Sequence, residues 1–181
     1  MAGKLLWHVT MSLDGFIAGP EDGMDWVFDF ATEASDEALA AIASNGAILA
    51  GRHWWDVAVE KYDGLAGIYG GQWSGPVFVM THHVPEPKGG DPVYLSGGLG
   101  TAVATALEAA QGKDVVVFGA NLAQQLVALG LIDELLVHIV PVFLGSGTRL
   151  IEASSVPRTD WKVMTATKSG EILNLKLELR K

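Results

Sequence analysis

The part of the sequence best suited to chemistry is a short β-branched strand that stops at a glycine and continues into a helical pattern. Positions 115–118 read Val-Val-Val-Phe, Gly119 follows, and the helical pattern opens with Ala120, Asn121 and Leu122. A buried strand followed by small residues and a helix start presents free backbone N–H groups to a phosphate, aided by the helix dipole. The alternative is that Gly119 only ends the strand and Asn121 caps the helix. The first interpretation predicts a nucleotide-type cofactor.

Two other strand ends carry side chains that could hold an anion. The pair Gly51-Arg52 follows a short apolar run, and the planar guanidinium of Arg52 could grip a cofactor phosphate. The alternative is a surface ion pair with Asp56, one helical turn further on, worth about 0.3–0.5 kcal/mol. Thr81 and His82 end another apolar run and could contact the adenosine phosphate end of the cofactor, or they could be a plain strand terminus.

Composition restricts the classes of function. The chain has 181 residues, 49% of them hydrophobic, and a formal net charge of −9, which argues against a nucleic-acid-binding surface. It has no cysteine, and it lacks the nucleophile-elbow, zinc-protease, P-loop and G-x-G-x-x-G patterns, so we expect no metal site. No secretory leader and no apolar run of about 18 residues is visible, so we expect a cytoplasmic protein without a membrane partner.

The elements that must position these residues alternate between strand and helix. We predict one domain over 1–181 and a glycine-rich loop over 62–75. Helices are predicted at 33–44, 101–111 and 122–129. Strands are predicted at 4–11, 47–50, 76–80, 92–95, 115–118 and 173–179. This order favours an α/β fold with a mostly parallel central sheet, helices on its faces and antiparallel strands at the C-terminus.

The last predicted strand has a regular alternation. Leucine occupies positions 173, 175, 177 and 179, and polar residues lie between them. We therefore expect one buried face and one wet face. An exposed terminal strand of this kind also makes a homodimer plausible.

Several motifs, taken in their order along the chain, resemble a known family. The motifs are the run at 11–18, Gly51-Arg52, the run at 118–122, and the run at 130–135 leading to 141–147. Together they resemble the dihydrofolate-reductase-like superfamily, and most closely the reductase domain of bacterial bifunctional riboflavin-biosynthesis proteins.

This resemblance implies a three-layer α/β/α fold, binding of NADPH, and hydride transfer to a small heterocycle of pterin, pyrimidine or ribosylated pyrimidine type. It implies that Asp14 lines the substrate pocket, although Asp-Gly is also a common turn pair. Ile17 and Ala18 would offer backbone groups to the nicotinamide carboxamide. Many relatives have arginine at the position of His82, and a neutral histidine would hold a 2′-phosphate less firmly. Family members are often dimers.

The sequence offers several candidates for the proton donor and more than one possible function. Dihydrofolate reductases use an acidic residue on the first helix, and the candidates here are Asp25, Asp29, Glu33, Asp36 and Glu37. A tryptophan could stack on a planar substrate, although aromatic residues more often fill the core; the candidates are Trp7, Trp26 and Trp55. The alternatives are a dihydrofolate reductase proper and a non-catalytic nucleotide-binding sensor or partner protein of the same fold.

Overall fold

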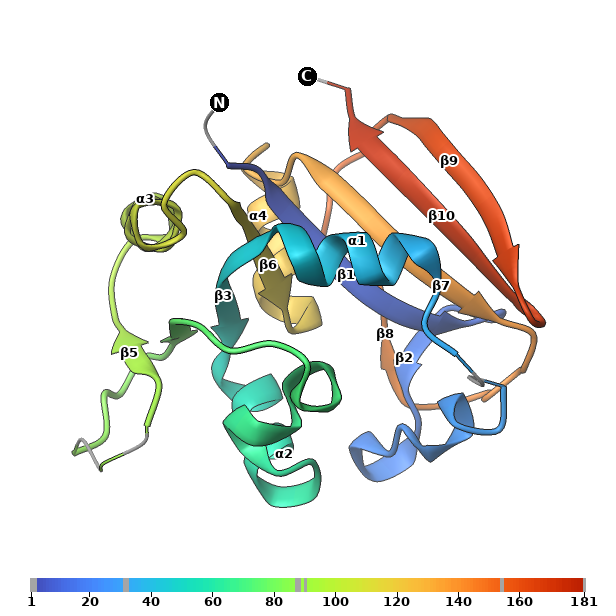
Figure 1. The fold of residues 1–181 in the computed structure, drawn as a ribbon, viewed down its shortest axis with the longest axis horizontal. Helices are drawn as coiled ribbons and strands as arrows, with labels where there is room; N and C mark the ends of the chain where they lie inside the picture. Colours follow the sequence, from blue (N-terminus) through green and yellow to red (C-terminus); the bar gives the residue numbers. More distant parts are fainter. Residues whose placement is uncertain (1–2, 31–32, 87–88, 90, 154, 181) are drawn as a thin grey trace.

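A central eight-stranded sheet organises the molecule in the computed structural model, which describes residues 3–30, 33–86, 89, 91–153 and 155–180 (Figure 1). The strand order is β5-β4-β3-β6-β1-β7-β10-β9. The strands are β1 (Leu5–Ser12), β3 (Asn45–Gly51), β4 (Val77–Met80), β5 (Val93–Leu95), β6 (Asp114–Phe118), β7 (Glu134–Val140), β9 (Trp161–Ser169) and β10 (Ile172–Leu179). A separate two-stranded sheet pairs β2 (Phe16–Ala18) with β8 (Thr148–Arg149).

The pairing confirms the predicted sheet. Strands β5, β4, β3, β6, β1 and β7 run parallel, and β10 and β9 add antiparallel pairs at one end. The parallel strands read as continuous apolar runs because both of their faces are covered. Val115, Val116 and Val117 illustrate this, since all three side chains are fully buried.

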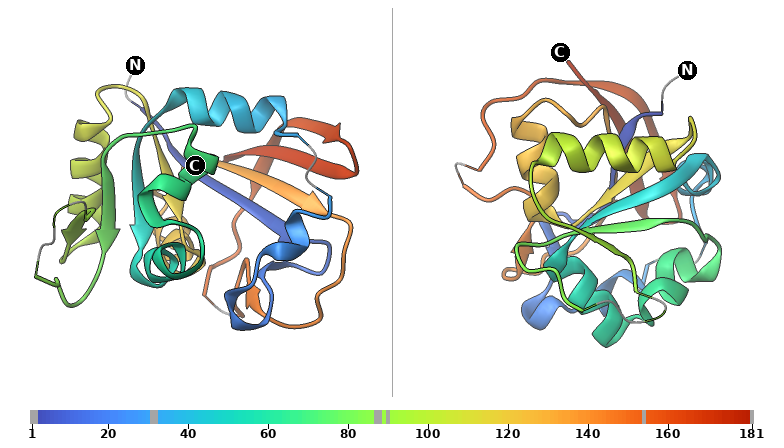
Figure 2. Two further views of the ribbon diagram at one scale, coloured as in Figure 1. Left: turned by 60° about the horizontal axis from the view of Figure 1, so that its bottom comes forward. Right: turned by 90° about the vertical axis from the view of Figure 1, so that its left-hand side faces the viewer.

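Helices cover both faces and give three layers, which Figure 2 shows from two further directions. The helices α3 (Leu99–Ala109) and α4 (Ala120–Ala128) pack on one face. The helix α1 (Asp36–Ser44), the helix α2 (Arg52–Lys61) and the 3₁₀ segment η3 (Gly64–Gly71) supply the other face. Two further 3₁₀ turns, η1 (Pro20–Asp22) and η2 (Asp25–Val27), lie between β2 and α1.

Helix α1 shows how local sequence sets an element's limits. It begins after Ser35, whose hydroxyl accepts a hydrogen bond from the Ala38 N–H at 3.1 Å. It ends at Ser44, and Asn45 at once starts β3. The side-chain oxygen of Asn45 accepts from the Val116 N–H at 3.3 Å, which ties the helix end to the neighbouring strand β6.

Two predictions need correction. On β10 the predicted alternation fails near the start of the strand: Asn174 is 1% exposed while Leu173 is 41% exposed, although Leu179 at the other end is buried as predicted. The reason is a hydrogen-bonding partner on β7, described below, that makes burial of the amide favourable. The predicted loop at 62–75 contains η3, whose short turns leave no periodic signal in the sequence.

Within the described residues, no helix is both long enough and apolar enough to cross a membrane.

Candidate active site

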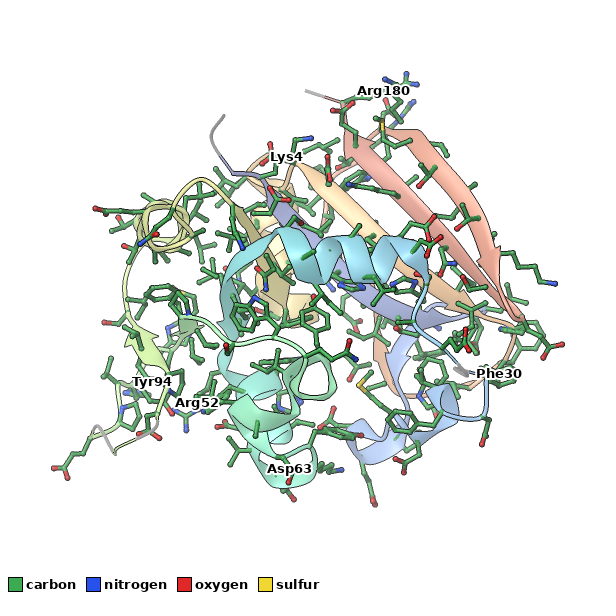
Figure 3. All side chains as sticks on the ribbon, in the orientation of Figure 1. Lys4, Phe30, Arg52, Asp63, Tyr94 and Arg180 are labelled. Atoms are coloured by element: carbon green, nitrogen blue, oxygen red, sulfur yellow. The ribbon has the colours of Figure 1, made fainter. Side chains whose placement is uncertain are left out.

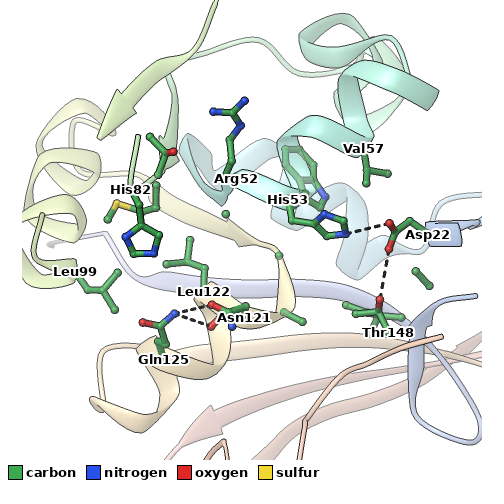
Figure 4. Close-up of a pocket in the computed structure, with 18 of the residues that line it drawn as sticks. Asp22, Arg52, His53, Val57, His82, Leu99, Asn121, Leu122, Gln125 and Thr148 are labelled. Carbon is green, nitrogen blue, oxygen red and sulfur yellow. Dashed lines mark hydrogen bonds and ion pairs between the residues drawn. The ribbon is translucent and has the colours of Figure 1, made fainter. Parts of the chain in front are cut away.

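A cleft of about 830 Å³ opens at the carboxyl ends of the parallel strands β3, β4 and β6. Figure 4 shows its walls, which come from α2 on one side and α4 on the other. The cleft is lined by all ten residues predicted to bind the cofactor, namely Ile17, Ala18, Gly51, Arg52, Thr81, His82, Gly119, Ala120, Asn121 and Leu122. The structure thus gathers into one place residues that lie more than 100 positions apart in the sequence.

Three helices begin at this cleft, and each begins after a glycine. The N-cap residues are Gly51 for α2, Gly98 for α3 and Gly119 for α4. In the described part of the chain, none of the three N-termini is closed by a side-chain hydrogen bond. The backbone N–H groups of the first turns are therefore available to an anion.

Gly119 follows the end of β6, as the alternative predicted, but Asn121 does not cap α4. Its side-chain oxygen accepts a hydrogen bond from Gln125 Nε2 at 2.7 Å instead, one turn further along the helix. This pair lies on the cleft wall (Figure 4). The helix start is consequently left to backbone groups alone.

Gly119 has a backbone that requires glycine. Its φ is +93°, and a Cβ atom there would lie 3.3 Å from Trp54 Cβ and 3.4 Å from Gly51 N. The ends of β3 and β6 therefore approach each other through two glycines. This close approach brings the starts of α2 and α4 together.

Arg52 forms an ion pair with Asp56. Its Nε donates to Asp56 Oδ1 at 2.7 Å, and its guanidinium lies 5.6 Å from the Tyr94 ring centroid (Figure 3). The bond to Asp56 raises the pKa of Arg52. The predicted ion pair one turn apart is confirmed, and Arg52 lines the cleft as well.

Thr81 and His82 lie at the end of β4 in a local turn. The Thr81 hydroxyl donates to the carbonyl oxygen of His83 at 3.0 Å, and the His83 N–H donates back to Thr81 Oγ1 at 3.2 Å. The side chain of His82 is exposed at the cleft.

Three cleft residues that the sequence did not indicate connect separate elements. Asp22 of η1 pairs with His53 Nε2 of α2 at 3.0 Å, and its other oxygen accepts from the Thr148 hydroxyl of β8 at 3.5 Å (Figure 4). These contacts hold η1 beside the cleft. Because the partners are far apart in sequence and ordinary in type, no local pattern marks them.

Asp14 is engaged in holding a loop. Its Oδ1 accepts from the Ser12 hydroxyl at 2.6 Å and from the Leu144 N–H at 3.1 Å, and its Oδ2 accepts from the Gly145 N–H at 2.7 Å. Desolvation opposes the charge, but these bonds outweigh it and lower the pKa of Asp14 to about 2. Asp14 does not line the cleft, and its predicted turn is present, since the Gly15 N–H donates to the Ser12 carbonyl oxygen.

A buried polar chain crosses the α1 face of the sheet. The Tyr69 hydroxyl lies 2.8 Å from His8 Nδ1, His8 Nε2 lies 2.8 Å from His138 Nε2, and His138 Nδ1 lies 2.6 Å from Asn174 Oδ1. The two histidines are only 8% and 9% exposed. The sequence signal for this chain is a single histidine inside each of two apolar strand runs, which the sequence reasoning passed over.

Burial controls the ionisation of this chain. Desolvation, helped by the neighbouring His138, lowers the pKa of His8 to about 3. Desolvation also lowers the pKa of His138, against the opposing effects of Asn174 and Glu37. The pKa of Tyr69 is raised by burial. All three groups are therefore neutral near pH 7.

Among the five acidic candidates for proton donor, only Glu37 interacts with this buried row of hydrogen-bonded side chains, and it does so through Thr167. Its Oε1 accepts from the Thr167 hydroxyl at 2.6 Å, and this bond lowers the pKa of Glu37. The other four are exposed: Asp25, Asp29, Glu33 and Asp36.

None of the three tryptophans proposed to stack on a substrate lines the cleft. Trp7 and Trp55 belong to the core, at 2% and 5% exposure. Trp26 Nε1 donates to the Gly23 carbonyl oxygen at 3.2 Å. The aromatic residue on the cleft wall is Trp54, whose ring stacks on Phe118 with centroids 4.6 Å apart and planes 13° apart.

Comparison with known sequences identifies one family. The sequence profile of the RibD C-terminal domain matches residues 3–175. No curated protein matches the chain.

Solved structures share the fold. A candidate riboflavin biosynthesis protein from Shewanella sp. PV-4 superposes with a TM-score of 0.81 at 20% identity, over 98% of this chain and 99% of that one. The diaminohydroxyphosphoribosylaminopyrimidine deaminase/5-amino-6-(5-phosphoribosylamino)uracil reductase of Thermotoga maritima gives 0.68 at 14% identity, over 99% of this chain and 57% of that one. Dihydrofolate reductase from Enterococcus faecalis, complexed with NADP(H), gives 0.66 at 13% identity, over 100% and 99%. The expected dihydrofolate-reductase-like fold is confirmed.

Proposed function

Because this chain belongs to the RibD C-terminal domain family, we propose that it is a reductase that uses NADPH to reduce a small heterocyclic substrate of pterin, pyrimidine or ribosylated pyrimidine type. The observation that carries the proposal is the cleft itself. Three glycine-capped helix starts open into one cavity, whose lining includes every residue that the family resemblance assigns to the cofactor.

The chemistry of the cleft fits a dinucleotide. Its backbone N–H groups suit a pyrophosphate, and its ionisable side chains are mostly basic in type although the whole chain is acidic. Arg52, His53, His82 and His83 line it together with a single carboxylate, Asp22. Arg52 and His82 are the side chains that would meet the adenosine phosphate end.

The protein's own part in the reaction is to position the reactants and keep water out. When bound, NADPH supplies a hydride. Ile17 and Ala18, on the small sheet at one end of the cleft, would fix the carboxamide of its nicotinamide. The ring of Trp54, which stacks on Phe118, would form an apolar part of the cleft wall.

One relative indicates a class of substrate. The Thermotoga protein is named as a uracil reductase as well as a deaminase, and this chain spans 57% of that protein. A pyrimidine or a related heterocycle is therefore the first acceptor to try, followed by pterins.

A titration with NADPH and separately with NADH tests the proposal. We expect saturable binding, read from nicotinamide fluorescence and from a rise in melting temperature, with preference for NADPH. Binding of neither by the folded protein would overturn the cofactor assignment. If NADPH binds but no pterin, pyrimidine or quinone acceptor is reduced, the result favours the sensor or partner protein, and folate-dependent oxidation would instead reveal a dihydrofolate reductase proper.

A further inference from the structure

The two ends of the cleft carry different side chains. At one end, Arg52 lies over the Tyr94 ring of β5 and His82 follows the end of β4. At the other end, the small sheet of β2 and β8 meets η1, and the side chain of Asp22 lines the cleft there. Figure 4 shows His82 and Asp22 on opposite sides of the cleft. Among the described residues that line it, Asp22 carries the only carboxylate.

The turn that carries Asp22 is closed on itself. The Gly19 N–H donates to the Gly23 carbonyl oxygen at 2.8 Å, and the Gly23 N–H donates to the Pro20 carbonyl oxygen at 3.2 Å. Within the turn, Glu21 and Asp22 have φ values of +56° and +58°, which are uncommon for residues other than glycine. Such a conformation costs free energy, so the surrounding contacts must hold it in place.

Two backbone contacts fix this turn to α2 without using the Asp22 side chain. Lys61 Nζ donates to the Glu21 carbonyl oxygen. The Met24 N–H donates to the Tyr62 hydroxyl at 3.1 Å. The turn is therefore held beside the cleft even when the partner of the Asp22 carboxylate changes.

The Asp22 carboxylate can accept further hydrogen bonds. Its Oδ2 lies 3.0 Å from His53 Nε2, and its Oδ1 accepts from the Thr148 hydroxyl at 3.5 Å, the limit for such a bond. A carboxylate offers about four lone-pair sites, so these two contacts leave others free. The His53 side chain is 74% exposed, and a pair this open to solvent contributes little stability. A donor group of a ligand can therefore take the place of His53.

Apolar side chains line the cleft together with this carboxylate. Val57 follows His53 by four residues on α2, so both side chains lie on the same side of the helix (Figure 4). Met24 and the ring of Trp54 line the cleft as well. A planar heterocycle has apolar faces and N–H groups at its edge, and both would find a counterpart among these residues.

The same end of the cleft offers no free cation to a phosphate. Among the described lining residues there, His53 is the basic one, and it is paired with Asp22. Lys61 and Arg149 do not line the cleft: Lys61 is bound to the Glu21 carbonyl oxygen, and the Arg149 guanidinium lies 4.4 Å from the centroid of an aromatic ring on β2. A phosphate next to Asp22 would meet a charge of its own sign.

We propose that Asp22 determines substrate specificity, accepting hydrogen bonds from N–H groups at the edge of the heterocycle in place of His53, and that the substrate carries no phosphate. This inference rests on the proposed function, because a nicotinamide held by Ile17 and Ala18 puts the substrate at the Asp22 end of the cleft. It favours aminopyrimidines and pterins, and it admits ribosylated pyrimidines only without a 5′-phosphate.

The first test measures binding of 2,4-diaminopyrimidine by calorimetry to protein saturated with NADP⁺. We expect Asp22→Asn to weaken this binding about 10- to 100-fold, the usual worth of hydrogen bonds to a charged group, with NADP⁺ binding unchanged. The matched control is Asp25→Asn, which changes the net charge equally at an exposed residue of η2 outside the cleft lining and should have no effect. Equal affinity of Asp22→Asn and the unaltered protein overturns the inference.

The second test asks whether His53 only occupies the place of the substrate. Because the pair with Asp22 is exposed, we expect His53→Ala to tighten binding of 2,4-diaminopyrimidine by up to about fivefold. Weakening as large as that of Asp22→Asn would overturn the exchange of His53 for the substrate.

The third test compares uridine with uridine 5′-monophosphate on protein saturated with NADP⁺, which keeps the nucleotide phosphate out of the cofactor site. We expect uridine to bind more tightly. Tighter binding of the monophosphate overturns this inference and leaves the proposed function standing, whereas failure of the folded protein to bind NADP⁺ overturns the proposed function itself.

Discussion

At the scale of single residues, the shape of the cleft depends on the absence of a side chain at Gly119. A side chain there would meet both a positive φ and the backbone of Gly51. We expect Gly119→Ala to destabilise the fold by about 1–3 kcal/mol, the usual cost of a strained backbone conformation. NADPH affinity should fall with it, because the helix start at Ala120 would move.

Gly100→Ala is the control for this prediction. Gly100 lies within α3, and nothing comes within 4 Å of the Cβ position. Alanine should therefore stabilise the fold by about 0.5–1 kcal/mol. Denaturant unfolding measures both variants, and equal stability of the two would contradict the role given to Gly119.

Cleft residues and buried residues differed in how far the sequence predicted them. Gly51, Gly119 and their neighbours were predicted because the motifs of the family occur in order, and the backbone geometry that needs glycine leaves glycine in the sequence. His8 and His138 left no comparable signal. Each is one polar residue in an apolar strand, and their partnership depends on strands that lie 130 positions apart.

At the scale of elements, the buried chain joins β1, β7 and β10 through side chains as well as through the sheet. His8 is neutral in the folded protein down to a pKa of about 3, whereas in the unfolded chain it titrates near 6.5. Above that higher value both states are neutral and the stabilisation is complete. As pH falls below it, the unfolded chain binds a proton that the folded chain refuses, so stability is lost on the way toward the folded pKa.

We therefore predict a melting temperature that drops between pH 6.5 and pH 4, with a loss of up to about 1.4 kcal/mol per pH unit from His8. His8→Gln should flatten this slope even though it lowers stability overall. His83→Gln, which removes an exposed imidazole, serves as the control. A slope that stays the same in His8→Gln would show that His8 is not the group responsible.

Several elements were predictable from local sequence. The strands β1, β3, β4, β5, β6 and β10 and the helices α1, α3 and α4 followed from apolar runs and spacing. The pairing of β2 with β8 did not, because three residues and two residues carry no period. The 3₁₀ segment η3 was missed for the same reason, and with it the position of Tyr69.

At the scale of the whole molecule, one edge of the sheet is open in the described structure. Strand β9 is the last in the order, and its apolar side chains Val163 and Met164 are 60% and 46% exposed. Exposed edges of this kind tend to be covered by another chain. The homodimer predicted from the sequence therefore remains our prediction, and β9 is the surface that would form it.

Sedimentation velocity tests the dimer. We expect twice the chain mass for the unaltered protein and a shift toward the monomer for Val163→Lys, because a buried charge without a partner opposes association. Val59→Lys changes a similarly exposed valine on α2, which packs against β3 and β4 far from β9 in the strand order, and should leave the mass unchanged. A monomer in all three samples would contradict the prediction.

The three glycine-capped helix starts also bear on how the cleft can vary. The donors that they would offer to an anion are peptide groups, which every amino acid carries, so the proposed binding would tolerate changes in most of the side chains around them. The fold itself is shared at 13–20% identity with the solved structures named above. Alanine scanning should therefore find few positions at these three helix starts where NADPH affinity falls. Replacing single backbone amides with esters at the start of α4 should lower NADPH affinity and so identify the N–H donors, which side-chain substitutions leave in place.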